Sequence, residues 1–458
     1  MLSAIPVLAV LGCAAQTAAS KASYRYASVT DNYKGQYGEV VERDVCVIGG
    51  GASGVHAAVS LKDKGKTVVV VERLNRLGGN TLTYLDPATG IPIDIGVVVF
   101  QPLPAVLRFF DKFKVPLANT STLTANVPGQ PANLSVPAPL YQTIQTYTDL
   151  RDGSSVNITR DDLAIGPALA GLAAVMAKYA YILDDFQALP HPVPEDLVMP
   201  FGDFMTKHNL TAAIPIVFQI GQGLGSLLQL PTLYVIKYFN LGDVTALREG
   251  YLTQAQGNNS LLYTRAASYL GPSNILLEST IISANRHSNT PSNRAELLVF
   301  TPSGSGMRLL SCGQILLTIP PTLSNLAGWD LTPDEHAVFS QFTGATGYWT
   351  GLVRGVGLNQ TVAHQNVAAT TPFQLPVLPA LYQVAAVGVV EDVWWVKLGA
   401  DTATLPDEQV KARAVREIQR VQVAQGVEAT EPEWLVFDSH VPFMLHARPK
   451  VTLTRSKQ

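Results

Sequence analysis

Three glycines near the beginning of the chain have the spacing of a loop that binds phosphate. Gly49, Gly51 and Gly54 come directly after the short apolar run of residues 45–48, which is typical of a buried parallel strand. The first glycine permits a tight turn, the second lets the backbone approach a pyrophosphate, and the third lets a helix pack on the strand. This pattern therefore predicts a dinucleotide-binding loop.

The elements that must position this loop follow in the expected order. Residues 52–64 have the pattern of a helix with one apolar face, and its first N–H groups would point at the phosphates. Residues 66–71 form the next predicted strand, and Glu72 ends it, where an acidic side chain holds ribose hydroxyl groups. An acid here, rather than an arginine, argues against a 2′-phosphate on the nucleotide. Since all these elements occur in order, an ordinary glycine turn is a poor explanation.

A second glycine pair just past this acid favours FAD over NAD. The stretch resembles the E-x-R-x-R-x-G-G-R pattern of the flavin-containing amine oxidases, with Glu72, Arg76 and residues 78–79 matching it. Leu74 and Asn80 stand where that family usually has arginine. The resemblance implies FAD as the cofactor.

The resemblance extends over nearly the whole chain. Residues 43–443 are most similar to the β-cyclopiazonate dehydrogenase group, fungal secreted relatives of the amine oxidases. The segments that carry the similarity are RDVCVIGGGASG, KTVVVVERLNRLGGNT, DPATGIPIDIGVVVF, TIPPTLSNL and FDSHVPF. The resemblance implies an α/β fold, in which a Rossmann-like FAD-binding domain of the glutathione-reductase and amine-oxidase type carries an interleaved α+β substrate domain.

Length and composition agree with two domains around a large core. The chain has 458 residues, of which 47% are hydrophobic and 15% charged, and its net charge is −3. The charge gives no sign of nucleic-acid binding, so we expect a small-molecule substrate, no nucleic acid and no membrane span. The expected divisions are a signal peptide at 1–20, a lead-in at 21–40, the FAD-binding domain at 41–96 and 265–330, the substrate domain at 97–264 and 331–443, and an atypical tail at 444–458.

The resemblance also implies which residues bind the cofactor. In related flavoproteins the stretch after a hairpin, here Asp94-Ile95-Gly96, runs close to the flavin, and Ile281 holds the position that carries the adenine-side backbone. The expected cofactor-binding residues are Gly49, Gly51, Ala52, Ser53, Gly54, Glu72, Arg73, Arg76, Gly78, Gly79, Asn80, Gly96, Val97 and Ile281.

Tyr348 and His440 are the candidates for an active-site role. In monoamine oxidases a lysine downstream of a Pro-Pro strand reaches flavin N5 through water, and Tyr348 aligns with that lysine. The nearby Lys397 is not in matching context, so the lysine arrangement is not carried over. His440 lies in the FDSHVPF segment, and a plain core role stays open for both candidates. The histidines show no metal-binding spacing such as H-x-x-x-H, so no metal site is expected.

Three functions remain open at this point. The first is an FAD-dependent oxidoreductase that abstracts hydride from an amine or N-heterocyclic metabolite. The second is a peroxide-forming flavin amine oxidase. The third is an inactive truncated protein with a flavin fold, because residues 444–458 lack the C-terminal strand and helix that the resemblance leads us to expect. Without that block we expect weak FAD binding.

The first twenty residues and the sequons favour secretion. Residues 1–20 are apolar, with small residues near a plausible cleavage point, although residues 10–13 also resemble a bacterial lipoprotein box. Cys46 and Cys312 both fall in predicted buried strands, so buried thiols are expected rather than a disulfide. N-x-S/T sequons begin at Asn119, Asn133, Asn157, Asn209, Asn258 and Asn359.

Overall fold

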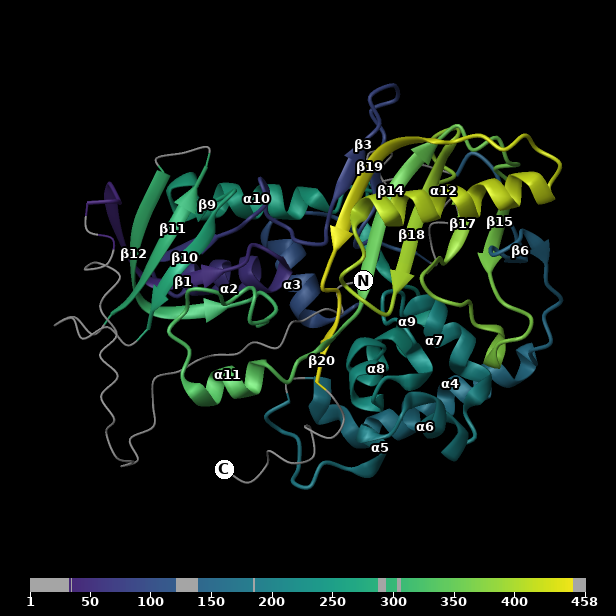
Figure 1. Ribbon diagram of the computed structural model, residues 1–458, viewed down its shortest axis with the longest axis horizontal. Helices are drawn as coiled ribbons and strands as arrows, with labels where there is room; N and C mark the ends of the chain where they lie inside the picture. Colours follow the sequence, from purple (N-terminus) through teal and green to yellow (C-terminus); the bar gives the residue numbers. More distant parts are fainter. Residues whose placement is uncertain are drawn as a thin grey trace.

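The computed structural model describes residues 33, 35–120, 139–183, 186–286, 294–302 and 306–447. Within them the chain forms two large sheets and a layer of helices (Figure 1). One sheet lies to the left in Figure 1, and the other lies to the right, with the long helix α12 (Asp407–Ala424) on it. The helices from α4 (Asp162–Met176) to α9 (Leu241–Glu249) lie below the second sheet.

The first sheet has six strands. In spatial order they are β10 (Thr280–Asn285), β11 (Ala295–Thr301), β12 (Gly306–Leu317), β1 (Glu39–Ile48), β2 (Val68–Val71) and β9 (Ile275–Leu276). Strands β12, β1, β2 and β9 are parallel, whereas β10, β11 and β12 form an antiparallel meander. Helix α2 (Ala52–Asp63) connects β1 to β2 and packs with α10 (Ser260–Leu270) on the parallel part. The predicted order of strand, glycine loop, helix and strand is confirmed.

A disulfide joins Cys46 in β1 to Cys312 in β12, so the prediction of two free buried thiols is wrong. The Cα atoms of the two cysteines are 5.8 Å apart, a separation that a disulfide bridges without movement of the backbone. The two residues are 266 positions apart in the sequence. Because they meet only through the pairing of β1 with β12, their spacing along the chain could not reveal that they are close.

The second sheet has eight strands. They are β19 (Glu433–His440), β14 (Gly347–Arg354), β18 (Val393–Ala400), β17 (Gln383–Ala386), β15 (Val362–Asn366), β6 (Ile144–Asp149) and β7 (Ser154–Ser155), with β16 (Ala380–Leu381) paired to β18. Helix α12 covers one face, where Val410, Ala414 and Ile418 pack in one core with Trp349 and Trp394. The apolar residues of α12 recur at the helical period, which explains why one of its faces is buried. The other face of the sheet is therefore the one available for a site.

Short helices form the layer below this sheet. They are α4, η2 (Ala177–Leu183), α5 (Glu195–Val198), α6 (Phe201–Lys207), η3 (Thr211–Ala213), α7 (Ile214–Ile220), η4 (Leu227–Gln229), α8 (Thr232–Tyr238) and α9. The apolar run at residues 210–239 contains the helices α7 and α8, which are buried in this layer. One helical stretch in the described part, Asp162–Leu183, has the length and hydropathy of a membrane span. Leu172 and Ile182 of that stretch are buried in the core of the helical layer.

Smaller elements connect these layers. The hairpin expected around residues 86–90 is present as β3 (Thr83–Leu85) and β4 (Pro92–Asp94). Helix α3 (Pro104–Lys112) packs through Phe110 into the same core as α2. The remaining elements are β5 (Leu117–Asn119), β8 (Leu252–Gln254), η5 (Pro272–Asn274), α11 (Pro333–Phe339), β13 (Gly344–Ala345), η6 (Pro372–Gln374) and β20 (Leu445–His446).

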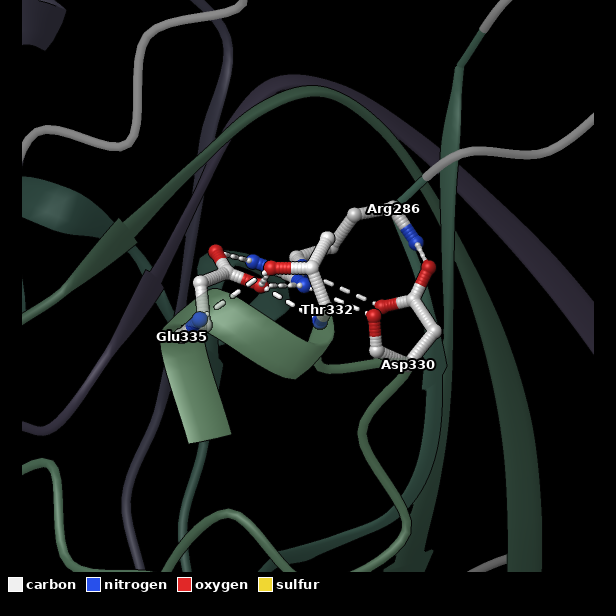
Figure 2. Close-up of polar contacts among 4 residues, drawn as sticks. All are labelled: Arg286, Asp330, Thr332 and Glu335. Carbon is white, nitrogen blue, oxygen red and sulfur yellow. Dashed lines mark hydrogen bonds and ion pairs between the residues drawn. The ribbon is translucent and has the colours of Figure 1, made fainter. Parts of the chain in front are cut away.

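A group of charged side chains fixes α11 to the end of β10 (Figure 2). The Arg286 guanidinium donates to Asp330 at 2.8 Å and, through both terminal nitrogens, to Glu335 at 2.6 and 2.7 Å. Thr332 and Glu335 also form the capping box at the start of α11. The hydrogen bonds from Arg286 lower the pKa of Glu335 to about 2.

Candidate cofactor and substrate site

Two glycine-containing loops meet at the carboxyl ends of β1 and β2. A Cβ atom added at Gly54 would lie 1.9 Å from the carbonyl oxygen of the first glycine of the motif, and one at Gly79 would lie 2.9 Å from Gly51 Cα. Gly78 donates its N–H to the carbonyl of Gly50 at 2.8 Å. Only bare backbone therefore fits here, and a bare backbone lets a pyrophosphate approach closely.

The N-terminus of α2 lies at this meeting point. The helix begins at Ala52, and its N-cap residue, Gly51, provides no side-chain cap for the first N–H groups. Ala52 and Ser53 are only partly buried. Uncapped N–H groups and the helix dipole together make a site for an anion such as a phosphate.

Glu72 is buried at the end of β2, and both of its carboxylate oxygens accept hydrogen bonds from backbone. One oxygen accepts from the Gly50 N–H at 2.6 Å, and the other accepts from the Leu74 N–H at 2.7 Å. The Ser279 N–H donates to the Glu72 carbonyl at 2.8 Å, which holds the segment between β9 and β10 beside the acid. Ile281 lies in β10, two residues beyond that bond.

Arg76 joins the second glycine loop to the second sheet. One terminal nitrogen donates to the carbonyls of Gly79 at 2.9 Å and Thr81 at 2.8 Å, while the other lies 3.1 Å from Asp438 Oδ2. The same oxygen of Asp438 lies 3.2 Å from His440 Nε2. A continuous set of polar contacts thus leads from the cofactor loop to His440.

His440 lies against the loop that follows the β3–β4 hairpin. A Cβ atom added at Gly96 would lie 3.1 Å from His440 Cε1 and 1.8 Å from the Asn80 carbonyl oxygen. The Val97 N–H donates to the same carbonyl at 3.1 Å. His440 is buried, and its Nδ1 has no hydrogen-bond partner within the described ranges. An unpaired nitrogen at this depth is available to a bound molecule.

On the face of the second sheet opposite α12, side chains are aligned in rows across β18, β14 and β19. Directly paired residues on neighbouring antiparallel strands point to the same face. The strand register therefore defines a first row of Trp395, Leu352 and Val436, a middle row of Lys397, Thr350 and Asp438, and a third row of Gly399, Tyr348 and His440.

Burial sets the protonation of these groups. Burial raises the pKa of Tyr348 well above its ordinary value, so the phenol stays protonated and donates to Gln222 Oε1 at 2.9 Å. Burial lowers the pKa of Lys397 to about 8. For Asp438, burial acts to raise the pKa, but the hydrogen bond to His440 and the charge of Arg76 lower it below its usual value. The carboxylate therefore stays ionised and can hold His440 in one orientation.

The structure brings the two catalytic candidates together, because Tyr348 and His440 are paired across β14 and β19 with ring centroids 5.8 Å apart. Arg73 is exposed at the surface. The sequence analysis missed Asp438 and the middle row. Asp438 could have been found from its spacing, since residues two apart in a strand share one face.

Comparisons with known proteins agree with this geometry. Residues 47–113 match the family model of an NAD(P)-binding Rossmann-like domain. Among solved structures, the fold is similar to a fatty acid isomerase from P. acnes that produces CLA, with a TM-score of 0.64 and 15% identity over 89% of this chain and 88% of that one. It is also similar to putrescine oxidase bound to putrescine, with a TM-score of 0.55 and 16% identity over 87% and 85% of the two chains. These similarities show the fold.

Two fungal relatives are similar in sequence over most of the chain. The FAD-dependent oxidoreductase oblC of Cochliobolus heterostrophus is 36% identical over 418 residues, covering 89% of this chain and 81% of that protein. The beta-cyclopiazonate dehydrogenase of Aspergillus oryzae is 31% identical over 411 residues, covering 88% and 82% of the two proteins. The glycine loops fit a dinucleotide, and both relatives are similar over most of their length. The chain therefore belongs to the family of FAD-dependent oxidoreductases that includes beta-cyclopiazonate dehydrogenase.

Proposed function

We propose that this enzyme removes a hydride from a carbon beside nitrogen in an amine or N-heterocyclic metabolite. The observation that carries the proposal is the position of His440 against Gly96, in the loop that leads from the cofactor site, with the Tyr348 ring beside the His440 ring. The buried rings of Tyr348 and Tyr382, with centroids 6.1 Å apart and planes inclined at 63°, form an aromatic corner that suits a planar nitrogen-containing ring.

The residues that would hold FAD are those of the two glycine loops and Glu72. The glycines let the pyrophosphate approach the uncapped first N–H groups of α2, and Glu72 is placed for the ribose of the adenosine. Bound FAD supplies the acceptor for a hydride, which the side chains of the protein cannot supply.

The side chains around the reacting carbon orient the substrate and move a proton. Asp438 fixes the His440 ring through Nε2, which leaves Nδ1 without a partner among the described residues. Nδ1 is therefore the atom that can accept the N–H proton of the substrate as its carbon is oxidised. Tyr348 and Tyr382 exclude water from the same space, since both rings are buried.

Anaerobic mixing of the purified FAD-loaded enzyme with indoline or tryptamine tests the proposal. Loss of the visible absorbance of oxidised flavin, with the matching imine or aromatised ring as product, is the expected result. Reduction by neither compound, while a chemical reductant still bleaches the flavin, would contradict the proposed substrate class. Peroxide measured after air is admitted would identify dioxygen as the electron acceptor.

A further inference from the structure

Two side chains of the middle row, Thr350 and Lys397, form no side-chain hydrogen bond or ion pair within the described residues. Thr350 is fully buried, yet its hydroxyl has no hydrogen-bond partner in the described residues. Leaving a buried hydroxyl unpaired costs about 1–3 kcal/mol. Lys397 is directly opposite Thr350 in the neighbouring strand, so the two side chains point to the same face.

Lys397 has no counterion in the part of the chain that the structure describes. Its Nζ lies 4.7 Å from the ring centroid of Trp395. The nearest carboxylate in its row, Asp438, is engaged by Arg76 and His440. With a pKa of about 8 the amine remains mostly protonated at neutral pH. A partly buried ammonium without an anion is costly to maintain, because a cation–π contact offsets only part of the lost hydration.

The rows on either side of the middle row pack against other parts of the protein. Leu352 of the first row packs with Ile93 and Ile95 of the hairpin segment. Tyr348 of the third row packs with the helical layer, where it contacts Phe443 and Tyr382. Between these two covers the middle row presents an amine and a hydroxyl. Lys397 is partly exposed and Thr350 is fully buried, so the middle row leads from an accessible amine to a buried hydroxyl.

We propose that Lys397 and Thr350 bind an anionic oxygen of the substrate, such as a carboxylate or enolate oxygen. The proposal rests on the proposed function, in that it places this oxygen on the same molecule whose carbon lies beside His440. The amine supplies charge and the hydroxyl supplies a directed hydrogen bond, which together select an anion over a neutral analogue of the same shape. Substrates should therefore combine a nitrogen-containing ring with an acidic group.

Calorimetric titration of the purified holoenzyme with indoleacetate and indoleacetamide tests this. The two probes have nearly the same shape and differ in charge. We expect the wild type to bind indoleacetate about tenfold more tightly than indoleacetamide. A difference of this size is what one hydrogen bond to a charged group contributes to affinity. Lys397→Met should remove this preference, because it should weaken the binding of indoleacetate alone. Thr350→Val should reduce the same preference. Lys411→Met, on the opposite face of the sheet in α12, is the matched control and should keep the preference.

Thermal melting separates ligand binding from a structural role. If Lys397 serves a ligand, Lys397→Met should melt at the same temperature as the wild type or higher, because an unpaired buried charge is removed. A lower melting temperature together with unchanged anion preference would overturn the proposal, as would equal affinity of the wild type for both probes. Anion preference without flavin reduction by indoline or tryptamine would leave this inference standing while the proposed substrate class fails.

Discussion

The guanidinium of Arg76 lies 3.1 Å from Asp438 Oδ2, although 362 residues separate the two in the sequence. The same guanidinium binds the carbonyls of Gly79 and Thr81, so one side chain holds the second glycine loop and the last strand of the second sheet at a fixed distance. The cofactor loop and His440 are thereby positioned by a single residue.

Replacing Arg76 should loosen this connection and weaken FAD binding. Arg76→Met removes three charge-assisted hydrogen bonds, and we expect the Kd for FAD to rise about tenfold or more. Fluorescence titration of the apoprotein with FAD measures the change. Lys114→Met, which removes an exposed ion pair with Asp111, should leave the Kd unchanged. Equal affinity in both variants would contradict the role given to Arg76.

Glu72 should contribute to FAD binding through its carboxylate. In Glu72→Gln the amide keeps the shape but loses the charge and one acceptor atom, so the bonds from the Gly50 and Leu74 N–H groups cannot both be kept. We expect lower FAD occupancy after purification, measured as the ratio of flavin to protein absorbance. Since FAD is expected to be held without a covalent bond, heat denaturation should release it all. Flavin that remains with the precipitate would show that this expectation is wrong.

His440 should matter for the rate of flavin reduction more than for cofactor binding. His440→Asn removes the nitrogen that would accept the substrate proton, and general base catalysis of this kind contributes about a hundredfold or more. Anaerobic stopped flow with a reducing amine measures the rate, while the flavin-to-protein ratio should stay at the wild-type value. Asp438→Asn should cause a smaller loss of rate, because the His440 ring is still present but is no longer held in one orientation. A variant that loses the flavin as well would indicate a structural role for His440.

The ion pair of Arg286 with Glu335 should stabilise the protein only above mildly acidic pH. The pKa of Glu335 falls from 4.5 to about 2 on folding, which corresponds to about 3 kcal/mol. A depressed pKa in the folded state means that this stability is fully present above pH 4.5 and is lost as the pH falls toward 2. The difference in melting temperature between wild type and Glu335→Gln should therefore shrink with acidification. The exposed Glu428→Gln should show no such trend.

We also propose that the chain enters the secretory pathway and is glycosylated. The apolar leader and the sequons support this, and the Cys46–Cys312 disulfide is of a kind that persists in oxidising compartments. Asn157 is exposed, whereas the amide of Asn119 donates to the Glu249 carbonyl at 3.0 Å; Asn133 lies outside the described residues. Expression with the leader in a fungal host should give a protein whose mass falls on glycosidase treatment, and Asn157→Gln should reduce that fall. A protein of unmodified mass would contradict the proposal.

The parts of this molecule that could be predicted from sequence are those set by neighbouring residues. The glycine spacing, the apolar strand before it and the turn at residues 86–90 are local, and each appears in the structure. The middle row is different, because Lys397 meets Thr350 only through the register of β14 with β18. Register between strands so far apart depends on the whole fold, so the sequence showed a lysine in a strand without showing what lies opposite it.

The cross-link between Cys46 and Cys312 turns the 265 residues between them into a closed covalent ring that includes the whole helical layer. A protease that cuts once anywhere inside this ring does not release a fragment, since both pieces remain attached through sulfur. Nicked enzyme should therefore run as a single band on a non-reducing gel and separate into two bands after reduction. The helical layer could thus be clipped by a protease while the two pieces remain one molecule.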